Sequence, residues 1–88
     1  MAREALNRHL PVSTQTPHYP ADLQRRGVKA SGVFDMDVDY ESGHIREVHI
    51  VQSTGNPILD RNTVVALKSW RARPRSIHTL RLPVNFGG

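Results

Sequence analysis

Three stretches of the chain alternate apolar and polar residues, which is the pattern of a β-strand with one buried face. These stretches are residues 32–40, 44–52 and 77–86. In the first stretch aspartates separate the apolar positions, which are Phe34, Met36, Val38 and Tyr40. In the last stretch the apolar positions are Leu80, Leu82, Val84 and Phe86. The alternation therefore predicts three strands that share one apolar sheet face.

The middle stretch departs from strict alternation. Its inward residues are expected to be Ile45, Val48 and Ile50, and the phase shifts between the first two of them. One extra residue in a strand, a β-bulge, produces such a shift. We therefore predict a bulge near Arg46–Glu47, after a hairpin turn formed by the letters ESG.

The stretch before the first strand carries the signals of a short helix. Pro20 suits the first position of a helix, and Gly27 can take the left-handed conformation that ends one. Asp22 and Arg26 lie near the helix ends that favour their charges. We predict a helix of about two turns with Leu23 as its main buried side chain.

A second helix is predicted between the middle and the last strand. Asn56 can cap it, with Pro57 at the first helical position and Asp60 as an alternative cap. Apolar positions three or four residues apart form its buried stripe. They are Leu59, Thr63, Leu67 and Trp70. Pro74 ends the pattern, so the helix is amphipathic and faces the sheet along one side.

The predicted order of elements is α-β-β-α-β. The second helix, about 13 residues long, spans roughly 20 Å and returns the chain to the end of the sheet where strand 44–52 began. Strand 77–86 then lies antiparallel beside strand 32–40, which gives the sheet order 2-1-3. The fold class is α+β, with a two-layer, three-stranded antiparallel sheet and two helices on one face. Strand 77–86 is left as an edge with unpaired backbone groups.

Length and composition fit one small domain. The chain has 88 residues, of which 38% are hydrophobic, enough for a thin two-layer core rather than a deep cavity. We predict a flexible tail or linker at 1–16, which lacks sustained periodicity, and a folded domain at 17–88. The sequence shows no secretory signal and no apolar run near the ~20 residues that span a bilayer. Whether the chain is a fragment and the tail native stays open.

The charge balance is basic. Twelve lysines and arginines against eight acidic residues give a net charge of +4. Such a balance suits nucleic acid, an anionic envelope surface or an acidic peptide. Aromatic residues are only 6% of the chain and mostly belong to the predicted core, so platforms for base stacking are missing. We expect no nucleic-acid partner and keep a basic nucleic-acid-binding domain as an alternative.

The letters DMDVDYESG also resemble the start of a calcium loop. Counting from Asp35, positions 1, 3 and 5 are acidic, but position 6 is Tyr40 instead of glycine and position 12 is Arg46 instead of glutamate. A strand explains the same letters, because its aspartates project from one face. Basic side chains of the flanking strands, such as His49 and Arg81, can partly neutralise them. We therefore predict a strand and its turn, with no metal site.

Catalytic patterns are missing from the sequence. The five histidines lack the His-x-x-x-His spacing of a zinc site on a helix, and cysteine is absent. Neither a Gly-x-Ser-x-Gly elbow nor a glycine-rich phosphate loop after a strand is present. The sequence therefore predicts a non-enzymatic protein without a cofactor.

Several short motifs occur in an order and at a spacing that resemble the TonB C-terminal domain family. They are PHYP at the first helix, STG before the second, ALKSWRARP along it and PVNF at the end. Gly32 opens the first strand and Gly43 closes the hairpin in the same pattern. The chain departs from it at Ala72, where the family usually has an aromatic residue, and at Thr16, which is often glutamine. The first hairpin is one residue shorter.

The resemblance implies a periplasmic module, tethered to the inner membrane in the full-length protein. Such domains bind the TonB box of an outer-membrane transporter and are driven by inner-membrane motor proteins. We expect the peptide to join the edge strand before Pro83, which has no N–H to donate. The predicted peptide-binding residues are Ile77, His78, Thr79, Leu80, Arg81 and Leu82. The predicted receptor-proximal residues are Thr16, Pro17, His18, Tyr19 and Pro20.

Two other uses of this fold stay open. The edge strand 77–86 can pair with its own copy to form a homodimer. The same fold can also serve as a TolA-like interaction domain or as part of a signalling protein. An upstream transmembrane helix with a proline-rich spacer in the full-length protein would favour the energy-transducer interpretation.

Overall fold

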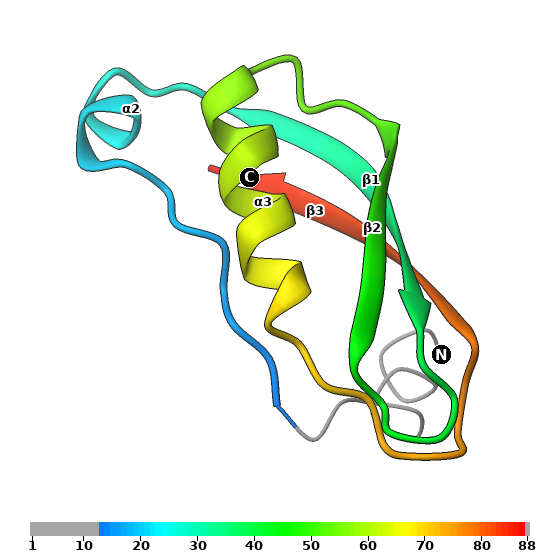
Figure 1. The fold of residues 1–88 in the computed structure, drawn as a ribbon. Coiled ribbons are helices and arrows are strands. Elements are labelled where there is room, and N and C mark those ends of the chain that lie inside the picture. The colour runs from blue at the N-terminus through cyan, green and yellow to red at the C-terminus, as the bar shows by residue number, and fades with distance from the viewer. Residues whose placement is uncertain (1–12, 88) are drawn as a thin grey trace, which may run out of the picture.

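The computed structural model describes residues 13–87, which form a three-stranded sheet with helices over one face (Figure 1). The elements are α2 (Ala21–Arg25), β1 (Ala30–Val38), β2 (Ile45–Gln52), α3 (Pro57–Lys68) and β3 (Thr79–Phe86). The sheet order is β2-β1-β3, and both pairings are antiparallel. The predicted α+β class and the sheet order 2-1-3 are therefore confirmed.

The hydrophobic core lies between α3 and the covered face of the sheet. Phe34 and Met36 of β1, and Leu59 and Leu67 of α3, are fully buried. Leu23 joins the same cluster from α2, so both helices contribute to one core. Burial of side chains of this size contributes roughly 1.5–3 kcal/mol each. The central strand supplies the largest buried residues because it is paired along both edges.

Strand β1 ends before Tyr40, which the alternation had placed inside the strand. The N–H of Asp39 donates to the carbonyl of His44, and its carbonyl accepts from the N–H of Gly43. The turn therefore begins at Asp39. Tyr40 lies in the turn and stacks on His78, with ring centroids 4.4 Å apart. The prediction of Tyr40 as an inward strand residue is wrong. The alternation of apolar and polar residues in the sequence continues past Val38, the last residue of β1 that pairs with β2.

The predicted bulge in β2 is confirmed. Asp37 pairs with Glu47, whereas its neighbour Val38 pairs with Ile45, so Arg46 is the extra residue. A bulge of this kind changes which side chains of the strand face the core. The extra residue shifts the alternation by one position, so Ile45 can face inward on the same side as Val48.

A second bulge lies at the other end of β2. Val33 pairs with Gln52 and Phe34 with Ile50, which leaves Val51 as the extra residue. Directly paired residues share a sheet face, so Ile50 faces the same side as Phe34. Ile50 is nevertheless 48% exposed, because β2 is an edge strand with no further strand beside it in the described part of the chain. The register places Ile50 on the core side of the sheet, but its expected burial is wrong.

The two candidate caps of α3 have separate roles. Asn56 is the cap residue, and its side chain accepts hydrogen bonds from two backbone N–H groups of the first turn. Pro57 occupies the first helical position as expected. Asp60 instead accepts hydrogen bonds from Ser53 and Thr54 in the turn before the helix. The cap and the anchor of the preceding turn are therefore different side chains.

The chain reaches α2 by running beside α3 (Figure 1). Ser13 and Arg71 exchange two backbone hydrogen bonds, so this path begins against the loop after α3. The helix α2 begins at Ala21 with Pro20 as its cap residue, whereas the sequence placed Pro20 at the first helical position. Residues 13–16, the last part of the predicted tail, thus lie beside the domain. Residues 1–12 fall outside the described part.

Candidate functional site

The outer edge of β3 is the binding site expected from the sequence. This strand pairs with β1 along its whole length, from Thr79 opposite Asp37 to Phe86 opposite Ala30. Within residues 13–87 no strand pairs with the other edge of β3. An edge strand presents a row of N–H and C=O groups with which another extended chain can pair.

The register of the sheet decides which residues present these groups. The N–H of Val38 donates to the carbonyl of His78 at 2.8 Å. Continuing the β1–β3 register places these two residues opposite each other. In an antiparallel ladder the directly bonded pairs alternate with pairs whose backbone groups point away. The predicted β3 residues with N–H and C=O groups directed to the free edge are therefore Thr79 and Arg81.

The side chains of the predicted site divide between the two faces of the sheet. Leu80 and Leu82 are half-buried and pack against the core on the helix-covered side. Thr79 and Arg81 are exposed on the open side. Pro83 follows with no backbone N–H, so the row of outward donors is interrupted there.

Two of the predicted residues lie just before β3. Ile77 is half-buried, whereas His78 is exposed and stacks on Tyr40 of the hairpin turn. The six predicted residues are consecutive in the chain, and the structure places them along the first half of the β3 edge. Four of them belong to β3, and the first two form its approach.

The guanidinium of Arg81 is held on the open face by Asp35, which lies directly opposite on β1. Arg81 Nε lies 2.8 Å from Asp35 Oδ1, and Nη2 lies 2.9 Å from Oδ2. Two parallel, charge-assisted hydrogen bonds fix the orientation of both groups. The hydrogen bond from Arg81 lowers the pKa of Asp35, and the same bond raises the pKa of Arg81. The expected neutralisation of an aspartate by Arg81 is confirmed.

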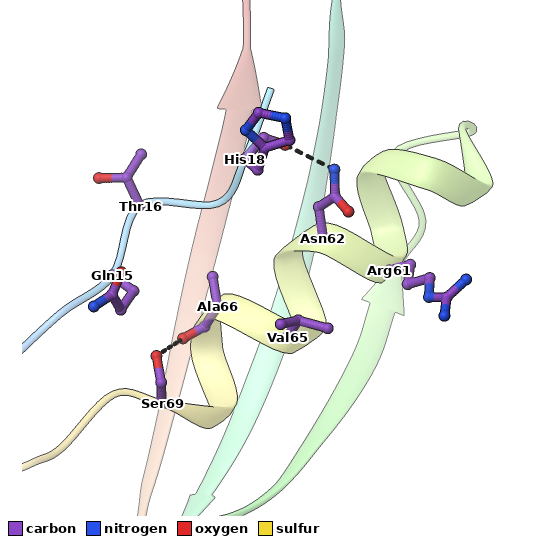
Figure 2. Close-up of a pocket in the computed structure, with 8 residues that line it drawn as sticks. All are labelled: Gln15, Thr16, His18, Arg61, Asn62, Val65, Ala66 and Ser69. Carbon is purple, nitrogen blue, oxygen red and sulfur yellow. Dashed lines mark hydrogen bonds between the residues drawn. The ribbon is translucent and has the colours of Figure 1, made fainter. Parts of the chain in front are cut away.

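Thr16 and His18, two of the predicted receptor-proximal residues, lie beside α3 (Figure 2). The side chain of Asn62 donates to the carbonyl of His18 at 2.9 Å. Tyr19 donates its hydroxyl to the carbonyl of Val28 and packs edge-on against Phe86, with ring centroids 5.4 Å apart. Phe86 ends β3, so this contact holds the segment against the opposite end of the strand from the predicted peptide-binding residues 77–82.

A groove of about 340 Å³ lies between this N-terminal segment and α3 (Figure 2). Thr16 lines it from the segment, and Val65, 64% exposed, lines it from the helix. Trp70 Nε1 donates to the carbonyl of Gln15 at 2.8 Å and holds the segment in place. The sequence pattern assigned Trp70 only to the core. Helical periodicity carries no information about a hydrogen bond to a residue so far away in the sequence.

The fold and the site define a class of protein. A free sheet edge and a shallow groove can receive an extended segment of a partner, and such features are typical of an interaction domain. The chain belongs to the family of Gram-negative bacterial TonB protein C-terminal domains, which it matches over residues 15–87. Domains of this family are non-enzymatic interaction domains, so the prediction of a protein without catalytic activity is confirmed.

Curated relatives show the same relationship. The TonB protein of Vibrio cholerae is 26% identical over 82 residues, covering 85% of this chain. The TonB protein of Xanthomonas campestris pv. campestris (strain B100) is 30% identical over 76 residues, covering 80% of this chain. The matched regions cover 33% and 34% of the lengths of those two proteins, respectively. The chain therefore spans about a third of the length of these relatives.

A solved structure has the same fold. The solution NMR structure of the Pseudomonas aeruginosa TonB C-terminal domain matches with a TM-score of 0.66 and 23% identity. The match covers 88% of this chain and 81% of that one. In the part of the chain that the structure describes, neither helix has the length and apolarity needed to cross a membrane.

Proposed function

We propose that this domain binds the TonB box of an outer-membrane transporter by adding it as a strand beside β3. In the full-length protein the domain lies in the periplasm, tethered to the inner membrane. There it passes to the transporter the energy that inner-membrane motor proteins draw from the proton-motive force. The observation that carries the proposal is the free edge of β3 with its outward backbone groups.

The spacing of these groups suits an extended partner. Thr79 and Arg81 are two residues apart, which is roughly 6.8 Å along a strand and equals the repeat of an antiparallel ladder. Strand addition takes its affinity from backbone hydrogen bonds, and alternate side chains supply the selectivity. Because Pro83 cannot donate, the partner gains no N–H bond at that position. Pairing is therefore centred on the first half of β3.

Arg81 can add selectivity to this pairing. Its bonds to Asp35 use two of the five guanidinium N–H groups, so donors remain for a carbonyl or carboxylate of the partner. His78 is exposed at the start of the same edge. The net charge of +4 also favours a neutral or acidic segment over a basic one.

The receptor-proximal segment offers a second contact. Tyr19 packs on Phe86 at the end of β3, so a partner that continues past the strand comes close to this segment. The groove between Thr16 and α3 opens on the same segment. We infer that residues 16–20 contact the transporter next to its TonB box.

One substitution separates backbone pairing from other modes of binding. Thr79→Pro removes an outward N–H but no hydrogen bond to β1, and proline is tolerated on edge strands. We expect it to weaken binding of a TonB-box peptide at least tenfold by isothermal titration, because a central backbone bond is lost and the ring crowds the partner strand.

Thr79→Ala is the matched control, because it removes the side chain and keeps the N–H. We expect its affinity to stay within about twofold of the parent chain. Equal affinities of the proline and alanine variants would contradict strand addition. A dimer through β3 is the competing use of this edge, and it predicts that Thr79→Pro shifts sedimentation toward the monomer in the absence of peptide.

A further inference from the structure

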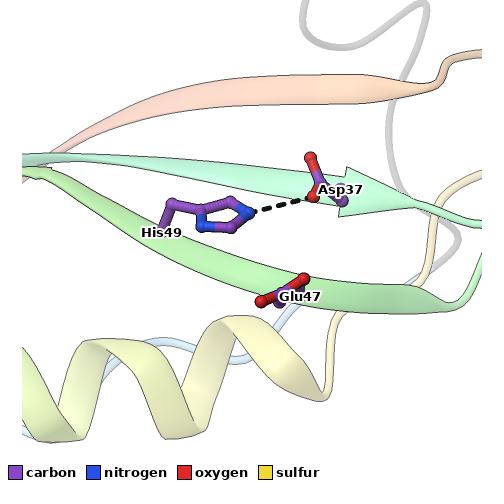
Figure 3. A group of neighbouring side chains, drawn as sticks. All are labelled: Asp37, Glu47 and His49. Atoms are coloured by element: carbon purple, nitrogen blue, oxygen red, sulfur yellow. Dashed lines mark hydrogen bonds and ion pairs between the residues drawn. The ribbon is translucent and has the colours of Figure 1, made fainter.

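Three potential metal ligands converge on the open face of the sheet, away from the helices. They are Asp37 on β1, and Glu47 and His49 on β2 (Figure 3). One ligand atom from each side chain lies within 4.8 Å of the other two. His49 Nε2 is 2.9 Å from Asp37 Oδ2. All three side chains are reachable from solvent, since Glu47 and His49 are exposed and Asp37 is only half-buried.

The strand register produces this convergence. Glu47 lies directly opposite Asp37, and His49 lies opposite Asp35, two residues further along the same face. Side chains of one face that are directly or diagonally opposite lie within reach of each other. The two strands are hydrogen-bonded partners, so the backbone of the site is rigid. A search for ligands close together in the sequence misses the site, because its members come from two strands.

The charges of the cluster are not balanced by the neighbouring residues. Like charges directly opposite each other, such as Asp37 and Glu47, destabilise a sheet. The nearby guanidinium of Arg81 is taken by Asp35. Within residues 13–87, Glu47 forms no ion pair, and His49 is the only partner of Asp37. Two carboxylates therefore face one imidazole, which is a favourable setting for a cation.

We propose that Asp37, Glu47 and His49 form a binding site for a divalent transition-metal ion such as zinc. An imidazole nitrogen with two carboxylate oxygens is a donor set that suits zinc and similar ions, whereas calcium and magnesium prefer oxygen alone. Tetrahedral ligands with bonds of about 2.0–2.1 Å lie roughly 3.3 Å apart. Small rotations of solvent-accessible side chains can reach this geometry without moving the backbone.

The bound ion joins β1 to β2 and leaves the free edge of β3 accessible. It bridges the two carboxylates that otherwise repel, and its remaining coordination position faces solvent. This site does not rest on the proposed peptide binding, because none of its three residues belongs to β3 or to the N-terminal segment. Loss of one function leaves the other in place.

A zinc titration of the full 88-residue chain, followed by amide and histidine-ring NMR signals, tests the site. We expect saturable shifts at Asp37, Glu47 and His49, and a melting temperature that rises with zinc concentration. His49→Gln should abolish both effects, and Glu47→Gln should weaken zinc binding severalfold. Because these side chains lie on the open face, the variants should keep the amide dispersion of the parent chain, which the same spectra check.

His44→Gln is the matched control, because His44 bonds to Arg71 outside the cluster. This variant should bind zinc as the parent chain does. Zinc-dependent shifts that persist in His49→Gln would overturn the proposal, as would a Glu47→Gln variant with unchanged affinity. Equal shifts with calcium and zinc would contradict the choice of a transition metal.

Discussion

Gly43 shows how one residue determines the shape of the first hairpin. Its φ of +82° lies in the left-handed region, and an added Cβ would stand 2.0 Å from the carbonyl oxygen of Ala72. The two residues are also joined by a hydrogen bond, because the N–H of Ala72 donates to the carbonyl of Gly43 at 2.8 Å. Only glycine fits both the conformation and the close approach. The hairpin therefore depends on this position to dock against the loop after α3.

Gly43→Ala should lower the free energy of unfolding by roughly 2–4 kcal/mol, because the strain of a left-handed alanine adds to the clash with Ala72. Gly55→Ala is the control, since Gly55 also has a positive φ, +85°, but no atom lies within 4 Å of its added Cβ. It should cost only about 1–2 kcal/mol. Urea unfolding at constant m-value measures both. Equal losses would show that the contact with Ala72 is unimportant.

At the scale of elements, Asp60 joins β2 to α3. Its carboxylate accepts hydrogen bonds from Ser53 and Thr54, the two residues that follow β2. Burial alone would raise the pKa of Asp60, but the hydrogen bonds from Ser53 and Thr54 outweigh it and lower the pKa below its usual value near 3.8. The folded state therefore favours the ionised form. The turn is held most firmly when this side chain is charged.

Asp60→Asn should destabilise the domain by roughly 1 kcal/mol at pH 7, because charged hydrogen bonds are replaced by neutral ones. The native pKa is depressed, so this contribution is complete above the unfolded pKa of about 4 and is lost as the pH falls through the folded pKa. The stability difference between parent and variant should therefore shrink below pH 4. Urea unfolding at a series of pH values measures it. A difference independent of pH would contradict the role of the charge.

The elements differ in how far the sequence could predict them. Periodicity identified the strands, α3 and the bulge at Arg46, because each depends on residues close together in the chain. It missed the start of the turn at Asp39 and the exposure of Ile50, since these depend on where pairing stops and on which strand forms an edge. The cluster of Asp37, Glu47 and His49 depends on a register between two strands, which a spacing motif cannot encode.

At the scale of the whole molecule, the two edges of the sheet are not equivalent. The outer strand β2 carries two bulges, at Arg46 and Val51, whereas β3 pairs with β1 in one uninterrupted register. Bulges twist an edge and make it a poor template for another strand. The regular edge of β3 is therefore the better position for an added strand. This contrast favours β3 over β2 as the binding edge on physical grounds alone.

The central claim, strand addition at β3, is tested most directly by intermolecular NOEs between the isotope-labelled domain and an unlabelled TonB-box peptide. We predict contacts from peptide backbone protons to the backbone protons of Thr79 and Arg81, and slower hydrogen exchange at both of their amides. The amides of Leu80 and Leu82 already bond to β1 and should change little. A folded domain whose peptide contacts lie only along β2 or in the groove beside α3 would contradict the account.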